Sequence, residues 1–395
     1  MFERETSEYL VQAVTSNISS AIKRKGDTDM RMSKFILGAL GLAGVIVVGA
    51  PSNSEAKETL IYANYISEVY TSSQADIWFM DEVEKRSNGE IVFERYFSGS
   101  LLKASDLYPG LSRGAADIVA GVPSAYNRND YPLTNVTLPF ITEKTDAVTK
   151  AFNELYLSNE DLRKEYEGRN AKLLYSRGYA ENSTWSRVPI TKASDYEGLK
   201  VRAVLAIADV MEELGATTVA VPFPEAVEGM GRGVVDAMSS APFDSAIKSG
   251  LPDIAKFGTD GGRMGVYATN MVSMNLDRWN SLSPENQKII SEVAAETVDV
   301  FAKLHAEEVK KAAEKLCEIA SKGDLKITVF SDEAAQQVRE IAYQPIADAW
   351  VKWASEAANV DAQSVLDGYI ALVKKYEPES DYKTGFQLYT EQCGS

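Results

Sequence analysis

Arg202 places a permanent positive charge at the end of a short apolar run in a strongly acidic chain. The chain has 395 residues, with 41 Lys and Arg against 57 Asp and Glu, and its formal net charge is -16. A guanidinium group offers parallel N–H donors that match a carboxylate, and it stays protonated at physiological pH. Because the net charge repels anions, an anionic ligand needs a local positive group of this kind. From its position alone, the alternative interpretation is that Arg202 is solvated or forms a salt bridge.

The other reactive side chains argue against several kinds of chemistry. His305 is the single histidine, and Cys317 and Cys393 are the two cysteines. They fit no metal-ligand spacing and supply no nucleophile–base pair, so we predict no metal, no cofactor and no enzyme activity. The acidic composition disfavours nucleic-acid binding, and no glycine-rich phosphate loop is present. We expect His305 at the surface or at a hinge, and the pairing of the two cysteines stays open.

The amino-terminal region reads as an export signal. Arg31 and Lys34 precede an apolar run at residues 35–50, and small residues follow up to Ala56. This pattern predicts a Sec signal peptide over residues 30–56 that is cleaved after Ala56. An uncleaved anchor is the alternative, but the run is shorter than the roughly 20 residues that span a bilayer. Residues 1–29 are then interpreted as an over-extended gene start. The mature chain is expected in the periplasm.

The rest of the chain alternates between strand and helix patterns, which position the polar residues. The pattern predicts strands such as 91–97, 116–123 and 198–203, with helices between them, and long helices over 283–322 and 332–357. This alternation is typical of α/β folds with parallel-type sheets. We expect two α/β lobes in one chain, with helices that hold them together. In residue numbers, lobe 1 is 57–179 and 268–312, lobe 2 is 180–267 and 313–370, and the tail is 371–395.

An ordered set of segments along the mature chain resembles the solute-binding proteins of TRAP (tripartite ATP-independent periplasmic) transporters of the DctP type. The set includes "YANY", "FMDEVEKRSNGEIVFERYFSGSLL", "LSRGAADIVAG", "SDYEGLKVRA", "LGATTVAVPFPEA", "GRGVVDAM" and "MNLDRWNSLSPENQKII". The resemblance implies a two-lobed α/β protein outside the cytoplasm, in which crossing strands and a long helix join the lobes. Such a protein closes on a small organic acid. It also implies delivery to the small and large membrane subunits of a permease driven by an ion gradient. A ligand-sensing periplasmic subunit is the alternative, and an extracytoplasmic enzyme on a similar fold is less favoured.

The resemblance also implies a binding site around Arg202, which matches the arginine that clamps the ligand carboxylate in this family. Polar groups of the pocket are expected at Asn64, Ser239 and Ser240, and at Ser124 near a strand end of the first lobe. Local turn hydroxyls are the alternative for the serines. Phe243 is either a pocket wall or a core residue.

The sequence departs from the family pattern after Gly178, where many members carry a second arginine. Here the segment "YAENSTW" offers Glu181 and Asn182 instead. Arg177 lies just before this glycine and is a candidate for the missing charge, although its register differs. Trp185 and Tyr179 are expected to form an apolar or aromatic wall of the pocket.

Overall fold

The structure is a computed structural model that describes residues 57–393. Its first sheet has five strands in the order β2-β1-β3-β10-β4. These strands are β1 (Glu58–Asn64), β2 (Ile91–Tyr96), β3 (Ile118–Gly121), β4 (Ala171–Gly178) and β10 (Thr269–Asn275). Strand β1 pairs in parallel with β2 and β3, whereas β10 runs antiparallel to β3 and β4. The predicted signal peptide and start lie outside the described residues.

The second sheet has six strands in the order β11-β9-β5-β8-β6-β7. These strands are β5 (Asn182–Ser186), β6 (Lys200–Arg202), β7 (Thr217–Val219), β8 (Ala237–Pro242), β9 (Phe257–Thr259) and β11 (Lys326–Thr328). All its pairs are parallel except those of β5, which runs antiparallel to β8 and β9. The expectation of parallel-type sheets is therefore wrong for one strand in each sheet. Both exceptions, β5 and β10, are strands that the chain enters after crossing from the other sheet.

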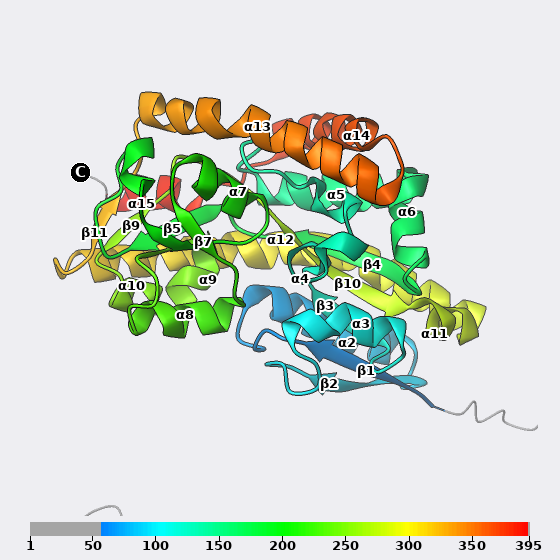
Figure 1. Cartoon of the computed structure of the whole chain (residues 1–395). Coiled ribbons are helices and arrows are strands. Elements are labelled where there is room, and N and C mark those ends of the chain that lie inside the picture. The colour runs from blue at the N-terminus through cyan, green and yellow to red at the C-terminus, as the bar shows by residue number, and fades with distance from the viewer. Residues whose placement is uncertain (1–56, 394–395) are drawn as a thin grey trace, which may run out of the picture. The chain divides into compact units, whose positions relative to one another are not determined.

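Two crossing segments and one long helix connect the lobes built on these sheets. Residues 179–181 join β4 to β5, and residues 260–268 join β9 to β10. Helix α12 (Pro284–Ala320) contacts both lobes, because its Glu296 pairs with Arg86 of α2 (Thr71–Arg86) and its Glu308 pairs with Lys248 of α9 (Phe243–Lys248). Figure 1 shows α12 in yellow running past both sheets. The predicted two-lobed fold with a bridging helix is present.

The remaining helices cover the sheets. They are α3 (Leu107–Ser112), α4 (Pro123–Tyr126), α5 (Thr145–Ser158), α6 (Glu160–Glu167), α7 (Ala206–Glu213), α8 (Phe223–Gly231), α10 (Leu251–Ile254), α11 (Leu276–Ser281), α13 (Asp332–Ala358), α14 (Ala362–Tyr376) and α15 (Gly385–Cys393). Short 3₁₀ turns lie at Ala104–Asp106, Arg128–Asp130, Leu133–Val136, Ala193–Tyr196 and Glu377–Glu379. Helix α14 packs on α5 of the first lobe, with an ion pair between Lys375 and Glu154 at 2.7 Å. The sequence-based boundaries instead place residues up to 370 in lobe 2.

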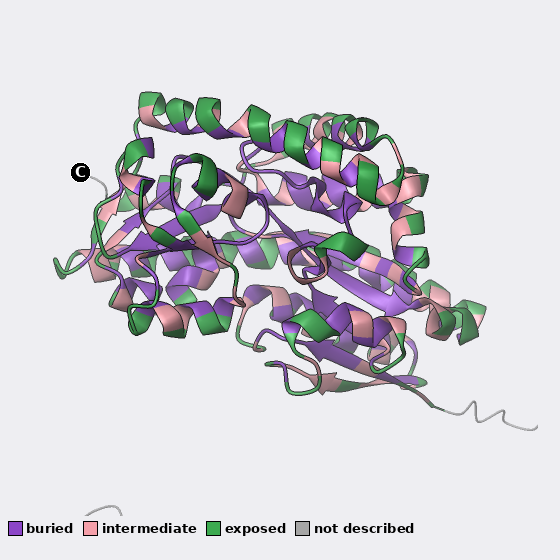
Figure 2. Cartoon of the chain, in the orientation of Figure 1, coloured by how far each residue is buried: buried purple, intermediate pink, exposed green. Residues whose placement is uncertain are grey.

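Most strands are buried, apart from the edge strands β2, β7 and β11, and the helices keep one face exposed to solvent (Figure 2). Every residue of β8 and β10 is buried, as expected for strands covered on both faces. Within residues 57–393, no helix combines the length and the apolar character needed to span a membrane. Polar groups that are buried inside the molecule need hydrogen-bond partners.

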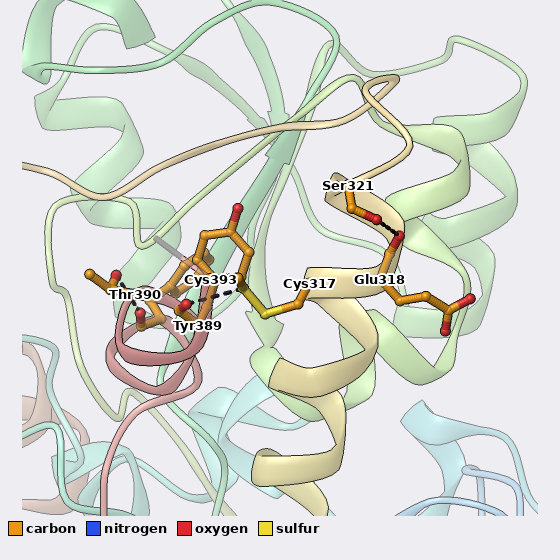
Figure 3. Close-up of a disulfide and its surroundings, with 7 residues drawn as sticks. Cys317, Glu318, Ser321, Tyr389, Thr390 and Cys393 are labelled. Atoms are coloured by element: carbon orange, nitrogen blue, oxygen red, sulfur yellow. Dashed lines mark hydrogen bonds between the residues drawn. A yellow bond between two sulfur atoms is a disulfide. The ribbon is translucent and has the colours of Figure 1, made fainter. Parts of the chain in front are cut away.

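The carboxyl-terminal segment is fastened to the long helix by a disulfide. Cys317 of α12 and Cys393 of α15 are bonded, with 6.0 Å between their Cα atoms, a normal separation for a disulfide (Figure 3). The same segment covers His305, whose ring stacks between Phe301 and Tyr382 at centroid distances of 5.1 and 5.8 Å. His305 is buried in this stack, so the expectation that it lies at the surface is wrong.

Candidate binding site

A small cavity lies between the lobes, beyond the carboxyl ends of several strands, where α/β folds bind ligands. Its water-accessible volume is about 50 Å³. The first lobe contributes Tyr65, Ile66, Tyr70, Ser72, Val122, Ala125 and Tyr126. The crossing segments contribute Tyr179 and Tyr267, and the second lobe contributes Arg202, Val204, Leu205, Phe223, Ser240, Pro242 and Ser245. The walls therefore come from both lobes and from the segments between them.

Arg202 is the one cationic side chain among the residues that line this cavity. It ends β6, and backbone carbonyls fix its guanidinium group. Nε and Nη2 both donate to the Val221 carbonyl at 3.0 and 2.8 Å, and Nη1 donates to the Ser240 carbonyl at 2.9 Å. The side chain is only 2% exposed. Nη1 also lies 3.4 Å from the Ser239 carbonyl, so these four contacts leave at least one of the five N–H donors of the guanidinium group free for another acceptor.

No carboxylate neutralises Arg202 within the part of the chain that the structure describes, since it forms no ion pair within 4.0 Å there. Neutral carbonyls satisfy some of its hydrogen bonds but leave its charge uncompensated. The charge acts on two tyrosines of the cavity: burial raises the pKa of Tyr126 and of Tyr267, and Arg202 opposes both shifts. A buried cation without a counter-ion is costly, and an anionic ligand would remove that cost.

The backbone next to Arg202 is strained on both sides. Leu205 and Ser240 line the cavity and adopt positive φ angles of 57° and 51°. Such conformations cost about 1–3 kcal/mol for a residue other than glycine and concentrate at functional sites. Hydrogen bonds hold this arrangement: the Ser240 hydroxyl accepts from the Val204 N–H at 3.0 Å, and the Ser240 N–H donates to Asn182 Oδ1 at 2.8 Å.

Aromatic rings form most of the remaining wall. Tyr65 and Tyr126 meet edge to face with their centroids 5.7 Å apart, and Tyr179 lies 6.4 Å from Tyr267. Tyr65, Ala125 and Tyr126 also border a wider hollow of about 580 Å³, which includes Lys103 and Glu225. This pair of tyrosines thus stands between the inner cavity and the wider space between the lobes. Of these four rings, sequence reasoning named Tyr179 alone, although each lies within a few residues of a strand end.

Arg177 does not reach the cavity, because a carboxylate holds it inside the first lobe. Its Nη1 and Nη2 donate to the two oxygens of Asp76 at 2.8 and 3.0 Å, and both side chains are fully buried. The hydroxyls of Tyr62 and Tyr175 also donate to Asp76. The guanidinium group of Arg177 is therefore committed to a structural ion pair.

Three predicted polar residues lie next to the cavity but not in its wall. Asn64 accepts from the Ile66 N–H at 2.9 Å and so supports the turn that carries Tyr65. The Ser239 hydroxyl bonds with Asn182 and Thr184, whereas its carbonyl faces Arg202 at 3.4 Å. Ser124 is buried in α4, between wall residues. These residues can position the site without lining it.

Four other predicted residues lie outside the cavity, beside the carboxyl-terminal segment or in the core of the second lobe. Glu181 accepts from the Tyr382 hydroxyl at 2.8 Å and from the Gly385 N–H at 2.6 Å. Glu181 and Asn182 border a separate hollow of about 300 Å³ beside α15. Phe243 packs against Phe386 at 5.0 Å, and Trp185 is buried in the core of the second lobe. Phe243 and Trp185 are core residues because the carboxyl-terminal segment and the second sheet cover them.

No group of three or more His, Cys, Asp or Glu side chains is arranged for a metal ion anywhere in residues 57–393. Of the ten predicted contacts, Arg202 and Ser240 line the cavity. The cavity as built can hold a small, largely apolar molecule with one anionic end.

Residues 63–352 match the protein family described as "Bacterial extracellular solute-binding protein, family 7" (DctP). Among curated proteins, the 2,3-diketo-L-gulonate-binding periplasmic protein YiaO of Escherichia coli (strain K12) is 24% identical over 311 residues, which is 77% of this chain and 92% of that protein. The ectoine-binding periplasmic protein TeaA of Halomonas elongata is also 24% identical, over 80% of this chain and 91% of its own length.

Solved structures share the fold over nearly their whole length. A TRAP periplasmic solute-binding protein from Desulfovibrio salexigens has a TM-score of 0.69 and 26% identity, and the match covers 82% of this chain and 98% of that one. A TRAP solute-binding protein from Rhodoferax ferrireducens in complex with copurified benzoate has a TM-score of 0.72 and 21% identity, with coverage of 81% and 99%. These matches confirm the predicted two-lobed fold.

Proposed function

Because the chain belongs to bacterial extracellular solute-binding protein family 7, the DctP-type family that its sequence resembles, we propose that it captures a small carboxylic acid and delivers it to a TRAP permease. The membrane subunits of that permease are the proposed partners. The export signal predicted at residues 30–56 would place the chain in the periplasm, and sequencing of the secreted protein should then find Lys57 first.

One observation supports the carboxylate above all. Arg202 is 2% exposed, faces the cavity between the lobes, and has no carboxylate partner in the described residues. A carboxylate in the cavity would supply the missing counter-charge and accept a charge-assisted hydrogen bond from Arg202. One relative binds 2,3-diketo-L-gulonate, one of the solved structures holds benzoate, and both ligands are carboxylates.

Capture by lobe closure follows from the origin of the cavity walls. Tyr65 and Tyr126 belong to the first lobe, whereas Arg202 and Phe223 belong to the second. A ligand that contacts both sets is bound more tightly when the lobes are together, so it shifts the population toward the closed state. No step of this cycle breaks a bond, which agrees with the names of the relatives as binding proteins.

Calorimetry with the Arg202→Gln variant tests the proposal. We expect the affinity for any acid that the wild-type protein binds to fall at least about 30-fold, because loss of one partner of a buried charge pair costs about 2–5 kcal/mol. Arg202→Lys separates charge from geometry, since lysine keeps the charge but not the planar fork. The matched control is Arg232→Gln, which removes an exposed arginine of the same lobe. Unchanged affinity in Arg202→Gln would refute the site.

A further inference from the structure

We propose that the ligand is a one-ring aromatic monocarboxylic acid, with its carboxylate on Arg202 and its ring among the tyrosines of the cavity. This inference rests on the proposed function, since it names the class of acid that the same cavity takes. Four properties of the cavity lead to it: the number of its cations, the chemistry of its wall, the commitment of two of its serine hydroxyl groups, and its size.

The cavity has one positive charge and so suits one carboxylate. Arg202 is the one cation in its wall, and the nearby Arg177 is held by both oxygens of Asp76. Asp244 is buried beside the wall residue Ser245 and carries a carboxylate. A second carboxylate on the ligand would therefore be desolvated without a cation, and close to like charge, which disfavours dicarboxylic acids.

The wall suits a ring better than a polyhydroxylated body. Apart from Arg202, the wall consists mainly of tyrosine and phenylalanine rings and of aliphatic side chains such as Val122 and Leu205. Aromatic rings pack favourably in offset or edge-to-face geometry, by about 0.5–1.5 kcal/mol beyond the burial of their area. The rings of Tyr65 and Tyr126 already meet each other edge to face at the cavity wall.

Two serine hydroxyl groups of the wall are already committed, so they offer little to the hydroxyl groups of a sugar acid. The Ser240 hydroxyl both accepts from the Val204 N–H and donates to the Val204 carbonyl at 3.1 Å, so it is already used twice. The Ser245 hydroxyl lies 3.4 Å from the Asp244 carboxylate and donates to it. A polar group that is buried without a hydrogen bond costs about 1–3 kcal/mol, and a sugar acid brings several such groups.

The size of the cavity suits a small acid. Its water-accessible volume is about 50 Å³, and Tyr65, Ala125 and Tyr126 separate it from the wider hollow of about 580 Å³. A one-ring acid needs less of this space than a larger body, which would have to extend past these tyrosines into the wider hollow.

Calorimetry of the full mature chain with four small acids tests the class. The probes are benzoate, its non-aromatic counterpart cyclohexanecarboxylate, succinate and galacturonate, with benzyl alcohol as the uncharged ring. We expect benzoate to bind at least tenfold more tightly than succinate and galacturonate, at least threefold more tightly than cyclohexanecarboxylate, and benzyl alcohol not to bind.

The possible failures are distinguishable. Tighter binding of succinate or galacturonate that still depends on Arg202 would overturn the aromatic class and leave acid capture standing. Equal binding of benzoate and cyclohexanecarboxylate would also overturn the aromatic class. Binding of benzyl alcohol as tight as that of benzoate would instead overturn acid capture itself.

The Tyr126→Leu variant tests the ring contact directly. Leucine fills much of the volume but has no aromatic face, so benzoate should bind about threefold to tenfold more weakly, and the preference over cyclohexanecarboxylate should disappear. The matched control is Tyr96→Leu on β2, outside the cavity wall. An unchanged preference in a folded Tyr126→Leu protein would contradict the proposal.

Discussion

At the scale of single residues, the chain uses two buried arginines for opposite purposes. Arg177 and Asp76 are both fully buried and pair through two hydrogen bonds, so each compensates the other. Arg202 is buried to nearly the same degree but is held by carbonyl groups alone. A binding site that waits for an anion must keep such a charge unpaired, at some cost in stability.

This contrast predicts that the same substitution lowers stability by different amounts at the two positions. Arg177→Met leaves the Asp76 carboxylate buried and unpaired, so the free energy of unfolding should fall by about 3–5 kcal/mol. Arg202→Met leaves no buried anion behind, only the Val221 and Ser240 carbonyls without their donor, so the free energy of unfolding should fall by no more than about 1–3 kcal/mol. Urea unfolding of the ligand-free variants measures both. Asp76→Asn should partly rescue Arg177→Met, and equal losses in the two single variants would contradict the contrast.

At the scale of elements, the long and strongly patterned segments could be predicted from sequence. The serine–proline start at Ser283 indicates the beginning of α12, and the Ser283 hydroxyl indeed accepts from the Asn286 N–H. Strand β2 carries enough β-branched and aromatic residues to be identified. Strands β9 and β11 are three residues long and show no usable period, so their pairing depends on the rest of the fold.

The site could be predicted only in part, because partners distant in sequence decide what each residue does. Arg202 stands out within a motif, but the fate of Arg177 depends on Asp76, which lies 101 positions away. The cavity tyrosines come from separate segments that the fold brings together. Phe243 follows a predicted strand like a wall residue, yet the carboxyl-terminal Phe386 covers it. None of these pairings leaves a local signal in the sequence.

The disulfide between α12 and α15 should stabilise the whole chain. It joins residues 76 positions apart, and closing a loop of this length in the unfolded chain contributes typically about 2–4 kcal/mol. We expect reductant, or the Cys317→Ser/Cys393→Ser double variant, to lower the free energy of unfolding by that amount in chemical denaturation. Reductant should have no effect on the double variant, which serves as the control. A wild-type protein that is equally stable with and without reductant would contradict this role.

At the scale of the whole molecule, the tail, the crossing segment and the site form one connected set of hydrogen bonds. The tail donates to Glu181 through the Tyr382 hydroxyl and the Gly385 N–H. The neighbouring Asn182 accepts from the Ser240 N–H, and the Ser240 carbonyl accepts from Arg202. Gly385 has no substitute here, because a Cβ would lie 2.0 Å from the Phe243 ring. Docking of the tail therefore fixes residues 179–181, one of the crossing segments that join the two lobes.

Glu181 should make the stability of the molecule depend on pH in a defined window. Burial raises the pKa of Glu181 to about 8, Glu143 adds to the shift, and the bonds from Tyr382 and Gly385 oppose it. The folded state thus holds a proton that the unfolded state releases near the ordinary pKa of about 4.3 for glutamate. The contribution of this group is complete below that ordinary pKa and is lost as the pH rises to about 8.

Chemical denaturation at pH values between about 5 and 8.5 tests this assignment. The free energy of unfolding should fall more steeply with pH in the wild-type protein than in Glu181→Gln, by up to about 1.4 kcal/mol per pH unit for one proton. Burial also raises the pKa of Asp260 to about 6 and that of Glu165 to about 7, but both groups remain in the variant and cancel in the comparison. The control is Glu391→Gln, an exposed carboxylate of the same tail, which should keep the wild-type slope. Parallel slopes for the wild-type protein and Glu181→Gln would show that the buried carboxyl does not carry the proton.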